Sequence, residues 1–393
     1  MKLRKLVAFA AVLAMVGVLF AGCGNSGGGS GDSGDGDATF KIGGIGPVTG
    51  PAAAYGVAVK NGMEMAVEEI NADGGINGTK IEIQFEDDEH DAEKALNAYN
   101  TLKDWGMQML LGTVTSTPCA AVAAETANDQ IFQLTPSGSA KECTANDNAF
   151  RVCFADPDQG KVSADYIADH DLAKKVAVIY DSSDNYSNGI YETFKAEADA
   201  KGLEIVAAEA FTADNNKDFS TQIQKAKDGG AELVFLPIYY TEASLILDQA
   251  KKADFTATFF GCDGLDGLLG LENFDTSLAE GVMLLTPFVA DADDEATQKF
   301  TKAYEEKYGE TPLQFAADAY DGIYAIKAAC EEEKVSADMD IAEICEKMMS
   351  GMTKITVNGL TGDEEGISWT ADGEPNKAPK ACVIKDGKYE MME

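Results

Sequence analysis

Short runs of β-forming residues alternate with stretches of helical periodicity from residue 40 onward, an alternation typical of parallel α/β sheets. The first series predicts strands at 40–42, 80–87, 107–111 and 131–134, and two helices. One of these helices carries Val59, Met63, Ala66, Val67 and Ile70 on one face and stops at Asp73-Gly74-Gly75. A second helix covers residues 92–105.

A second series of the same kind follows and predicts a second lobe. Its strands are expected at 176–180, 203–209, 233–236, 258–260 and 282–285, and its helices at 189–201, 219–228 and 242–253. Further helices are expected at 295–308, 315–333 and 341–350, followed by a turn-rich tail, 369–389, with a strand at 382–385. Because this tail is too small for a separate domain, it must complete one lobe, and we expect the chain to cross between the lobes more than once.

The N-terminus has the pattern of a secretory signal rather than of a spanning helix. Lys2, Arg4 and Lys5 precede an apolar run at 6–20, and Ala21-Gly22-Cys23 resembles a bacterial lipobox, with Phe20 where leucine is usual. We therefore expect a signal peptide at 1–22, cleavage before Cys23 and lipidation of its thiol. Residues 23–38, rich in Gly, Ser and Asp, are expected to form a flexible tether.

Charge and cysteine content exclude several classes of function. Without the signal peptide the chain has 28 Lys and Arg against 67 Asp and Glu, a net charge of −39, which excludes nucleic acid as a partner. With two histidines and no C-x-x-C motif, no metal site is expected. Seven cysteines follow Cys23, and sequence proximity favours disulfides between Cys119 and Cys143 and between Cys330 and Cys345.

Two motif matches fail in their sequence context. Gly24 to Gly28 matches the G-x-S-x-G pattern of serine hydrolases but lies in the predicted tether, with no strand before it. Gly44-Ile45-Gly46 resembles part of a dinucleotide fingerprint, yet Pro47 removes a backbone N–H that would face phosphate. We therefore expect no cofactor, and both histidines, flanked by acids, are interpreted as surface residues.

Small hydroxyl residues cluster after two predicted strands. Thr113, Thr115, Ser116 and Thr117 follow one strand, and Thr135, Ser137 and Ser139 follow the next. In open parallel sheets ligands bind at this edge, where hydroxyls and the free N–H groups of helix starts attract a carboxylate. Simple N-capping is the alternative for either cluster alone.

The second lobe offers the complementary chemistry. Tyr186, Tyr239-Tyr240 and Asp263 follow predicted strands, and an aspartate with phenols nearby can hold an ammonium group by charge and cation–π contact. Each tyrosine alone is equally consistent with half-buried packing. Together with the hydroxyl clusters they predict a site for a zwitterion.

The chain also resembles the amino-acid-binding proteins of branched-chain amino-acid ABC importers, the leucine/isoleucine/valine-binding family. The markers of the resemblance are Gly46 to Gly56, Ala66 to Gly78, Asp87-Asp88, Gly112 to Ser116, Thr135-Pro136-Ser137, Asp181 to Gly189, Lys217-Asp218-Phe219 and Tyr320-Asp321. The resemblance implies the type I periplasmic-binding-protein fold: two doubly wound, Rossmann-like α/β lobes joined by a three-strand hinge near Asp156, Pro287 and Thr361. The N-terminal lobe would comprise 39–156 plus 288–361, and the C-terminal lobe 157–287 plus 362–393.

The resemblance also implies roles for individual residues. Ser116, Gly138 and Ser139 would receive the ligand's α-carboxylate, Tyr186, Tyr240 and Asp263 its α-ammonium, and Tyr55, Tyr239 and Phe315 would border the side-chain pocket. Two departures stand out. Asp263 replaces the usual glutamate, and His90 and Thr115 occupy the places of a disulfide found in some members.

These features predict a binding protein and not an enzyme. The expected function is that of a monomeric extracytoplasmic lipoprotein that binds an amino acid, branched-chain or similar, between its lobes and delivers it to the permease subunits of an ABC importer. Its expected location is on the outer face of the cytoplasmic membrane or in the periplasm, held there by the lipid. A ligand-sensing subunit for a signalling partner and an extracytoplasmic hydrolase are the alternatives.

Overall fold

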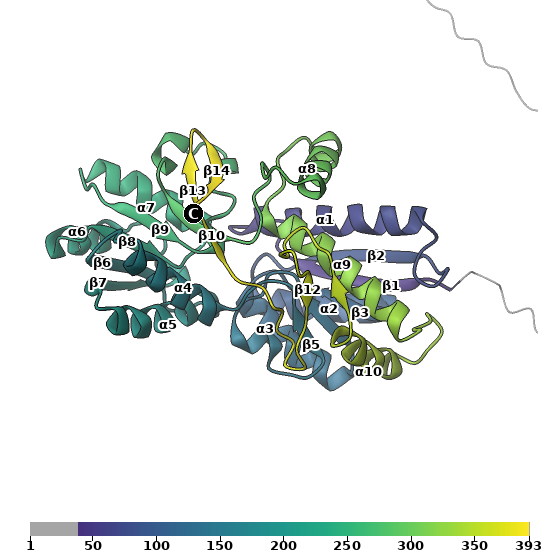
Figure 1. The fold of residues 1–393 in the computed structure, drawn as a ribbon. Helices are drawn as coiled ribbons and strands as arrows, with labels where there is room; N and C mark the ends of the chain where they lie inside the picture. Colours follow the sequence, from purple (N-terminus) through teal and green to yellow (C-terminus); the bar gives the residue numbers. More distant parts are fainter. Residues whose placement is uncertain (1–37, 393) are drawn as a thin grey trace, which may run out of the picture. The chain divides into compact units, whose positions relative to one another are not determined.

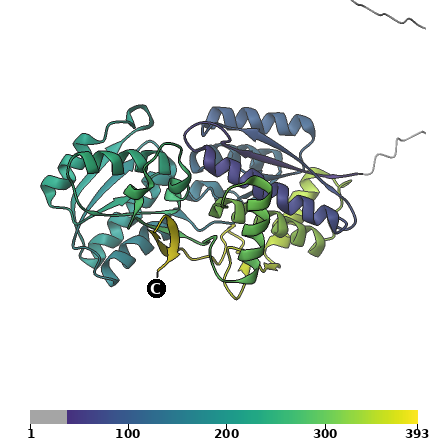
Figure 2. The same ribbon diagram turned by 90° about the horizontal axis from the view of Figure 1, so that it is seen from above.

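The structure, a computed structural model, describes residues 38–392. The predicted signal peptide, the lipidation site Cys23 and all but the last residue of the predicted tether lie outside these residues. The described part contains two large β-sheets, each with its own helices, and Figures 1 and 2 show them as two separate groups. Within it, no helix is both long and apolar enough to cross a membrane.

The first sheet has five parallel strands in the order β2-β1-β3-β4-β5. Its strands are β1 Phe40–Gly46, β2 Ile81–Asp87, β3 Met109–Gly112, β4 Phe132–Thr135 and β5 Ala149–Arg151. The helices α1 Ala53–Ala72, α9 Gln314–Glu332 and α10 Ile341–Met352 cover one face, α2 Ala92–Trp105 and α3 Ser116–Asp129 the other. Helices on both faces make this lobe, which we call the N-terminal lobe, doubly wound.

The second sheet has seven strands in the order β14-β13-β10-β9-β8-β6-β7. Its strands are β6 Lys175–Asp181, β7 Glu204–Phe211, β8 Leu233–Leu236, β9 Thr258–Gly261, β10 Met283–Thr286, β13 Lys380–Lys385 and β14 Lys388–Met391. Helices α4 Asp156–Asp169 and α5 Asn185–Lys201 pack on one face, α6 Ser220–Gly229 and α7 Tyr240–Lys252 on the other. Strand β13 pairs antiparallel with both β10 and β14, and the other strand pairs of this sheet are parallel. This sheet and its helices form the C-terminal lobe.

Smaller elements complete the fold. They are helix α8 Glu295–Tyr308, the two-stranded pair β11 Thr356–Val357 and β12 Ile367–Ser368, and the 3₁₀ turns Lys141–Thr144, Ala213–Asn215, Asp263–Leu265, Leu268–Gly270 and Thr276–Ala279. Helix α8 joins the N-terminal lobe, because Tyr304 accepts a hydrogen bond from Asn61 on α1 at 3.1 Å and Lys307 pairs with Glu68 at 2.6 Å.

Helix α1 shows how the sequence pattern becomes a buried face. The five apolar residues predicted to share one face, Val59, Met63, Ala66, Val67 and Ile70, are all buried. Gly62 lets α1 approach α9 closely, since a Cβ there would lie 2.1 Å from the Ala316 carbonyl oxygen. The chain then turns away at Gly74 and Gly75, whose φ angles of +111° and +85° favour glycine.

The last return to the C-terminal lobe lies later in the chain than expected. Thr361, the predicted third crossing, is held to α9 by Asp321, whose Oδ2 accepts from Thr361 N at 2.9 Å. Trp369 Nε1 donates to Arg151 O at 2.7 Å, and Arg151 N donates to Gly373 O at 3.0 Å. The segment 369–374, which we call the strap, therefore lies beside β5, and the assignment of all of 362–393 to the C-terminal lobe is corrected. The chain joins the second sheet only at β13.

The expected disulfides are not formed. All seven cysteines of the described residues are buried free thiols. Cys330 Sγ faces Met348 Sδ at 3.4 Å and Cys345 Sγ faces Met349 Sδ at 3.9 Å, so neither points toward the other. Cys119 and Cys143 share a small buried cluster with Ala140, where their thiol groups interact with each other but form no disulfide.

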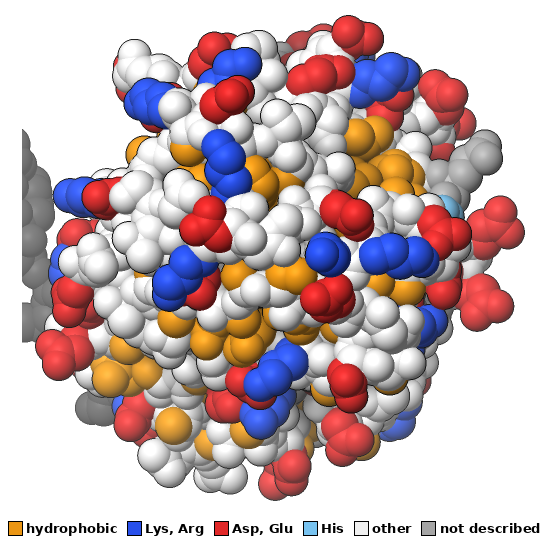
Figure 3. All heavy atoms as spheres, turned by 90° about the vertical axis from the view of Figure 1, so that its left-hand side faces the viewer, with side chains coloured by type: hydrophobic (Ala, Val, Ile, Leu, Met, Phe, Trp, Pro, Cys, Tyr) orange, Lys and Arg blue, Asp and Glu red, His pale blue; other side chains and the backbone are white. Residues whose placement is uncertain are grey.

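Charged side chains are dispersed over one face of the molecule. On the face seen in Figure 3, acidic and basic side chains are interspersed, with small apolar areas between them. This distribution agrees with the interpretation of the acidic composition as a solvated surface rather than a single charged patch.

Candidate functional site

The two hydroxyl clusters predicted from the sequence meet at the carboxyl edge of the N-terminal sheet. Ser116 is the first residue of α3, and its Oγ accepts hydrogen bonds from Ser139 N at 3.2 Å and Ala140 N at 3.1 Å. Ser139 Oγ is buried and makes no well-formed hydrogen bond among the described residues, although it lies close enough to the Asp156 carboxyl to offset part of the rise that burial causes in the pKa of that acid. A hydroxyl beside the first turn of a fourteen-residue helix is suited to an anionic group.

Gly138 contributes shape rather than a free donor. Its N–H donates to Thr135 Oγ1 at 2.7 Å, so it is not directed at a ligand as the sequence prediction required. A Cβ at this position would lie 2.7 Å from Thr135 Oγ1 and 2.8 Å from Cys119 Sγ. Glycine therefore permits the tight loop that presents Ser139.

Asp263 forms the opposite end of the site, from the C-terminal lobe. Tyr186 OH donates to Asp263 Oδ1 at 2.8 Å and accepts from Gly264 N at 2.9 Å, while Asp263 N donates to Gln159 Oε1 at 3.2 Å. Burial raises the pKa of Asp263 to about 7, against the lowering effect of the Tyr186 hydrogen bond. A cation beside this carboxyl would restore its ionised form.

Tyr240 does not lie at the ammonium end of the site beside Asp263, contrary to the prediction. Its hydroxyl accepts from Ala54 N at 3.3 Å, and its own N–H donates to Tyr55 OH at 3.3 Å. Because Tyr239 and Tyr240 are adjacent at the start of α7, their side chains diverge, and only Tyr239 faces the cavity that Asp263 lines.

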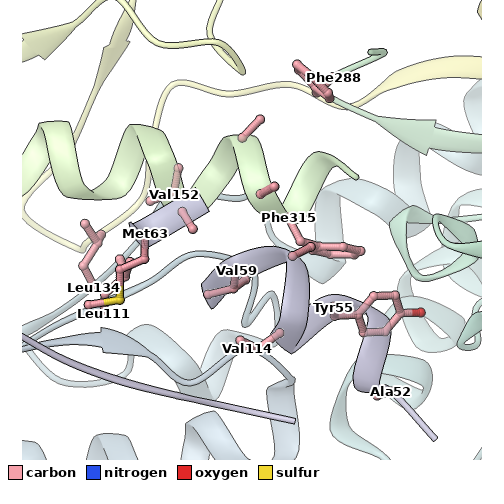
Figure 4. Close-up of a cluster of buried hydrophobic side chains, with 14 of the residues drawn as sticks. Ala52, Tyr55, Val59, Met63, Leu111, Val114, Leu134, Val152, Phe288 and Phe315 are labelled. Carbon is pink, nitrogen blue, oxygen red and sulfur yellow. The ribbon is translucent and has the colours of Figure 1, made fainter. Parts of the chain in front are cut away.

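Four aromatic rings form the apolar wall of the site. Tyr55 lies 4.4 Å from Phe315 and 5.7 Å from Tyr239 between ring centroids, and Tyr239 stacks on Tyr186 at 4.9 Å. Figure 4 shows Tyr55 on α1 and Phe315 on α9 converging. Tyr55 OH donates to Gly264 O at 2.5 Å, which links the two lobes directly across the site.

These residues surround one cavity. It is lined by Tyr55, Val114, Thr115, Ser116, Ser137, Ser139, Tyr186, Tyr239, Asp263, Gly264 and Phe315. Its volume of about 10 Å³ is no more than a single water molecule occupies. A ligand of amino-acid size therefore enters only if the walls contributed by the two lobes move apart.

His90, interpreted from the sequence as a surface residue, instead borders the site. Its Nδ1 lies 2.9 Å from Thr115 Oγ1, and its ring meets the edge of Tyr239 at 5.2 Å between centroids. His90 and Thr115, which the resemblance placed at the positions of a disulfide, are thus in contact. The acidic residues that flank His90 in the sequence did not indicate that it lies beside the site.

The sequence also gave no indication of two buried acids beside the site. Asp184 accepts from Thr117 Oγ1 at 2.8 Å, a contact between the lobes, and burial raises the pKa of Asp184 while His90 opposes the shift. Burial also raises the pKa of Asp156 well above its usual range. These carboxyl groups make the surroundings of Asp263 favourable for a positive charge.

A larger cavity, of about 680 Å³, lies elsewhere between α1, α8 and the β13–β14 hairpin. Of the predicted site residues it includes only Tyr240. No cluster of residues suited to a metal ion occurs in the part of the chain that the structure describes.

Comparison with known proteins agrees with this fold. The periplasmic binding protein family matches residues 39–387. The chain is 32% identical over 333 residues to Leu/Ile/Val-binding protein homolog 3 of Brucella melitensis, a match that covers 84% of this chain and 88% of that one. It is 29% identical over 330 residues to the leucine-, isoleucine-, valine-, threonine- and alanine-binding protein of Pseudomonas aeruginosa, covering 84% and 87%.

Among solved structures, the branched-chain amino-acid transporter substrate-binding protein LivJ of Streptococcus pneumoniae, in complex with isoleucine, matches with a TM-score of 0.80 and 29% identity, covering 90% of this chain and 98% of that one. The leucine-binding protein LivK of Thermotoga maritima matches with a TM-score of 0.81 and 26% identity, covering 90% and 98%. These relatives are solute-binding proteins and not enzymes, as predicted, and their family implies an extracytoplasmic location. The chain belongs to the periplasmic binding protein family, among the branched-chain amino-acid-binding proteins.

Proposed function

We propose that this chain binds an α-amino acid between its two lobes and delivers it to an ABC importer. The observation that carries the proposal is the pairing of opposite receptors on one cavity. Ser116 and Ser139 from one lobe and Asp263 with Tyr186 from the other line the same space. Such a site suits a small molecule with a negative group at one end and a positive group at the other.

The carboxylate of the ligand would lie at the start of α3. The Ser139 hydroxyl and the N–H groups of Ser116 and Thr117 at the helix start are the donors available to it, since Pro118 has no N–H and Cys119 N already donates to Thr115 O at 3.0 Å. Hydrogen bonds to a charged group contribute about 1.5–3 kcal/mol each, enough to orient the ligand.

The ammonium group would lie against Asp263. Tyr186 holds one of the two carboxyl oxygens, and the ring faces of Tyr186 and Tyr239 add cation–π attraction. Because the side chain of Asp263 is one methylene shorter than glutamate, the ligand would have to sit closer to the C-terminal lobe than in relatives with the longer acid.

The aromatic wall would receive the ligand's side chain. Tyr55, Tyr239 and Phe315 offer mostly apolar surface, which favours an aliphatic group. The names of the relatives describe binding of leucine, isoleucine and valine, and for one of them threonine and alanine as well. This range of small aliphatic side chains is the one we propose for this chain.

Binding would be coupled to movement of the lobes. The contacts that Tyr55 makes with Gly264 and that Thr117 makes with Asp184 join the two lobes across the site, so they must break for a ligand to enter. We propose that the lobes pivot about crossings near Asp156, Pro287 and the segment between the strap and β13, and that the ligand-bound arrangement is the one the permease recognises.

The N-terminal part of the chain would hold the protein at the membrane. Lipidation of Cys23 after removal of residues 1–22 is the proposal, supported by the sequence pattern alone. Mass spectrometry of the mature protein, compared with a Cys23→Ala variant released into the medium, tests it.

A thermal-shift screen against amino acids tests the binding proposal. A ligand at a hundredfold its Kd should raise the free energy of unfolding by about 2.7 kcal/mol. We expect the largest shifts with small aliphatic amino acids and none with their N-acetyl derivatives, which lack the positive charge. A flat response across all amino acids would refute the proposal.

A further inference from the structure

Arg151 is the only arginine of the predicted mature chain, since the one other arginine, Arg4, lies in the signal peptide. Every other basic residue after Cys23 is a lysine. The Arg151 side chain has an exposed fraction of 0%. A chain that uses lysine throughout its surface thus has a single guanidinium, and that guanidinium is completely buried.

The guanidinium holds the backbone of the loop that presents Ser139. Nη1 donates to Gly138 O at 3.1 Å and to Ser139 O, and Nη2 donates to Ala140 O at 3.0 Å. Three consecutive carbonyl groups are thereby turned toward one side chain. A lysine ammonium is a single point and cannot match this fork-shaped set of donors.

The orientation of these carbonyls has a direct effect on the site. The N–H groups of Ser139 and Ala140 point instead toward Ser116 Oγ, at 3.2 and 3.1 Å. Arg151 and Ser116 therefore hold the same loop through its carbonyl and N–H groups respectively. Their combined hold fixes where the Ser139 hydroxyl lies.

The strap keeps the guanidinium in place from behind. Arg151 Nε donates to Glu374 Oε1 at 3.1 Å, and Thr144 Oγ1 accepts from Nη2 at 2.7 Å while donating to the same Glu374 oxygen at 2.8 Å. Because the Glu374 side chain is 37% exposed, water screens its charge, whereas the guanidinium lies in the dry interior. Asp156, another acid that interacts with Arg151, is buried, and burial raises its pKa well above the usual range and so favours its neutral form. A positive charge therefore remains behind the carboxylate end of the cavity.

We propose that Arg151 is a positioning residue for carboxylate recognition: it fixes residues 138–140 and supplies positive charge behind the anion-binding end of the site. This inference rests on the proposed function. Arg151 does not line the cavity, so it acts through the loop and through its charge rather than by touching the ligand.

Ligand pairs that differ only at the carboxylate test this role. L-leucine, L-valine and L-alanine are each compared with their primary amides by isothermal titration calorimetry, using the wild type and the Arg151→Lys and Arg151→Gln variants. We expect both variants to weaken binding of the free acids by about tenfold or more and to change binding of the amides much less. A purely structural role would weaken acids and amides alike, and that result would overturn the inference.

A matched control separates this effect from loss of stability. Lys377 is also buried and pairs with Asp318 at 2.9 Å, but neither residue lines the cavity. Lys377→Met should lower the melting temperature and leave the ratio of amide to acid Kd unchanged. A ratio that falls as far in Lys377→Met as in Arg151→Lys would also overturn the inference.

A milder variant keeps the test decisive if the Arg151 variants do not fold. Thr144→Val removes one outer partner of the guanidinium and leaves the loop contacts intact. We expect a smaller fall in the same ratio, and an unchanged ratio would count against the inference. A wild type that binds none of the three acids would instead refute the proposed function.

Discussion

Tyr186 and Asp263 are joined by a hydrogen bond of 2.8 Å inside the cavity wall, where both side chains are buried. The tyrosine hydroxyl lowers the pKa of the aspartate, yet burial prevails and raises that pKa to about 7. The proposed ammonium receptor would therefore exchange a proton near neutral pH, which would make ligand binding sensitive to pH.

Affinity for an amino acid should fall as pH falls from 8 to 5. Below pH 7 the ligand-free Asp263 is protonated, and an ammonium ion must displace that proton before it can pair with the carboxylate. The loss approaches about tenfold in Kd per pH unit well below pH 7. Calorimetry in buffers of different ionisation enthalpy should show about one proton released at pH 6. Asp263→Asn should bind weakly, with little dependence on pH, and an equal wild-type Kd at pH 5 and pH 8 would contradict the assignment.

The stability of the ligand-free protein should change with pH in the opposite direction. Burial raises the pKa of Asp88, Glu242 and Asp263 to about 7 and that of Asp266 to about 6. Between about pH 4 and 7 the folded chain then binds more protons than the unfolded chain, so their stabilising contribution is lost as pH rises through this window. The melting temperature should be higher at pH 5 than at pH 8.

A charge-neutral variant checks the origin of that difference. Glu242→Gln keeps an acceptor for Asn216 Nδ2, which lies 2.8 Å from Oε1 in the wild type. It should reduce the gap in melting temperature between pH 5 and pH 8, whereas the exposed Glu343→Gln should leave the gap as it is. A gap unaffected by Glu242→Gln would mean that other groups are responsible.

Substitutions of the two serines at the proposed carboxylate end should separate effects on ligand affinity from effects on stability. Ser139→Ala removes a hydroxyl that makes no well-formed hydrogen bond among the described residues and only approaches the Asp156 carboxyl, so the melting temperature should change little while Kd rises about tenfold. Ser116→Ala removes the acceptor of two backbone N–H groups and should in addition cost about 1–3 kcal/mol of unfolding free energy. Urea unfolding together with calorimetry measures both quantities. Tight binding retained by Ser139→Ala would exclude its hydroxyl as a carboxylate donor.

Cysteines introduced at positions 90 and 115 should be able to form a disulfide bridge. The side chains of His90 and Thr115 are in contact at 2.9 Å, and a double variant His90→Cys/Thr115→Cys should form a disulfide on air oxidation. Closing a loop of roughly 25 residues should stabilise the protein by about 3 kcal/mol. Thiol titration in denaturant and the melting temperature with and without reductant provide the readouts. Two additional titratable thiols after oxidation would show that the Cβ atoms are badly oriented.

Gly62→Ala tests the close approach of α1 and α9. Because the new Cβ would lie 2.1 Å from the Ala316 carbonyl oxygen, the helices must separate, at a cost of about 1–3 kcal/mol. Gly270→Ala, where nothing lies within 4 Å of the added atom, should change stability by less than about 0.5 kcal/mol. Equal unfolding free energies for the two variants would argue against this helix contact.

Periodic segments with clear ends could be predicted from the sequence almost to the residue. Helix α2 occupies 92–105 as expected, because Asp91 caps it by accepting from Lys94 N and Gly106 ends it with φ +92°. Helix α3 was not predicted, since its buried face is built largely from small residues and its start, Ser-Thr-Pro, has the composition of a loop. Local periodicity therefore located most elements, and the exceptions lack a strong apolar stripe.

The site was predictable in its chemistry but not in the direction of its side chains. The two hydroxyl clusters do meet, and Asp263 does face them, because parallel strands bring their carboxyl ends to one edge. Tyr240 and Gly138 were assigned contacts that their neighbours have, since a helix start and a tight loop turn adjacent residues in different directions. Arg151 and His90 contact residues that are distant from them in the sequence, and no local sequence pattern reveals such contacts.

The pairing of β10 with β13 also has a consequence for biogenesis. Two of the seven strands of the C-terminal sheet come from the last residues of the chain. During synthesis β10 therefore keeps an unpaired edge until residues 380–391 have left the ribosome, and its lobe cannot close earlier. The C-terminal lobe is therefore completed only after every helix and strand of the N-terminal lobe has been synthesised.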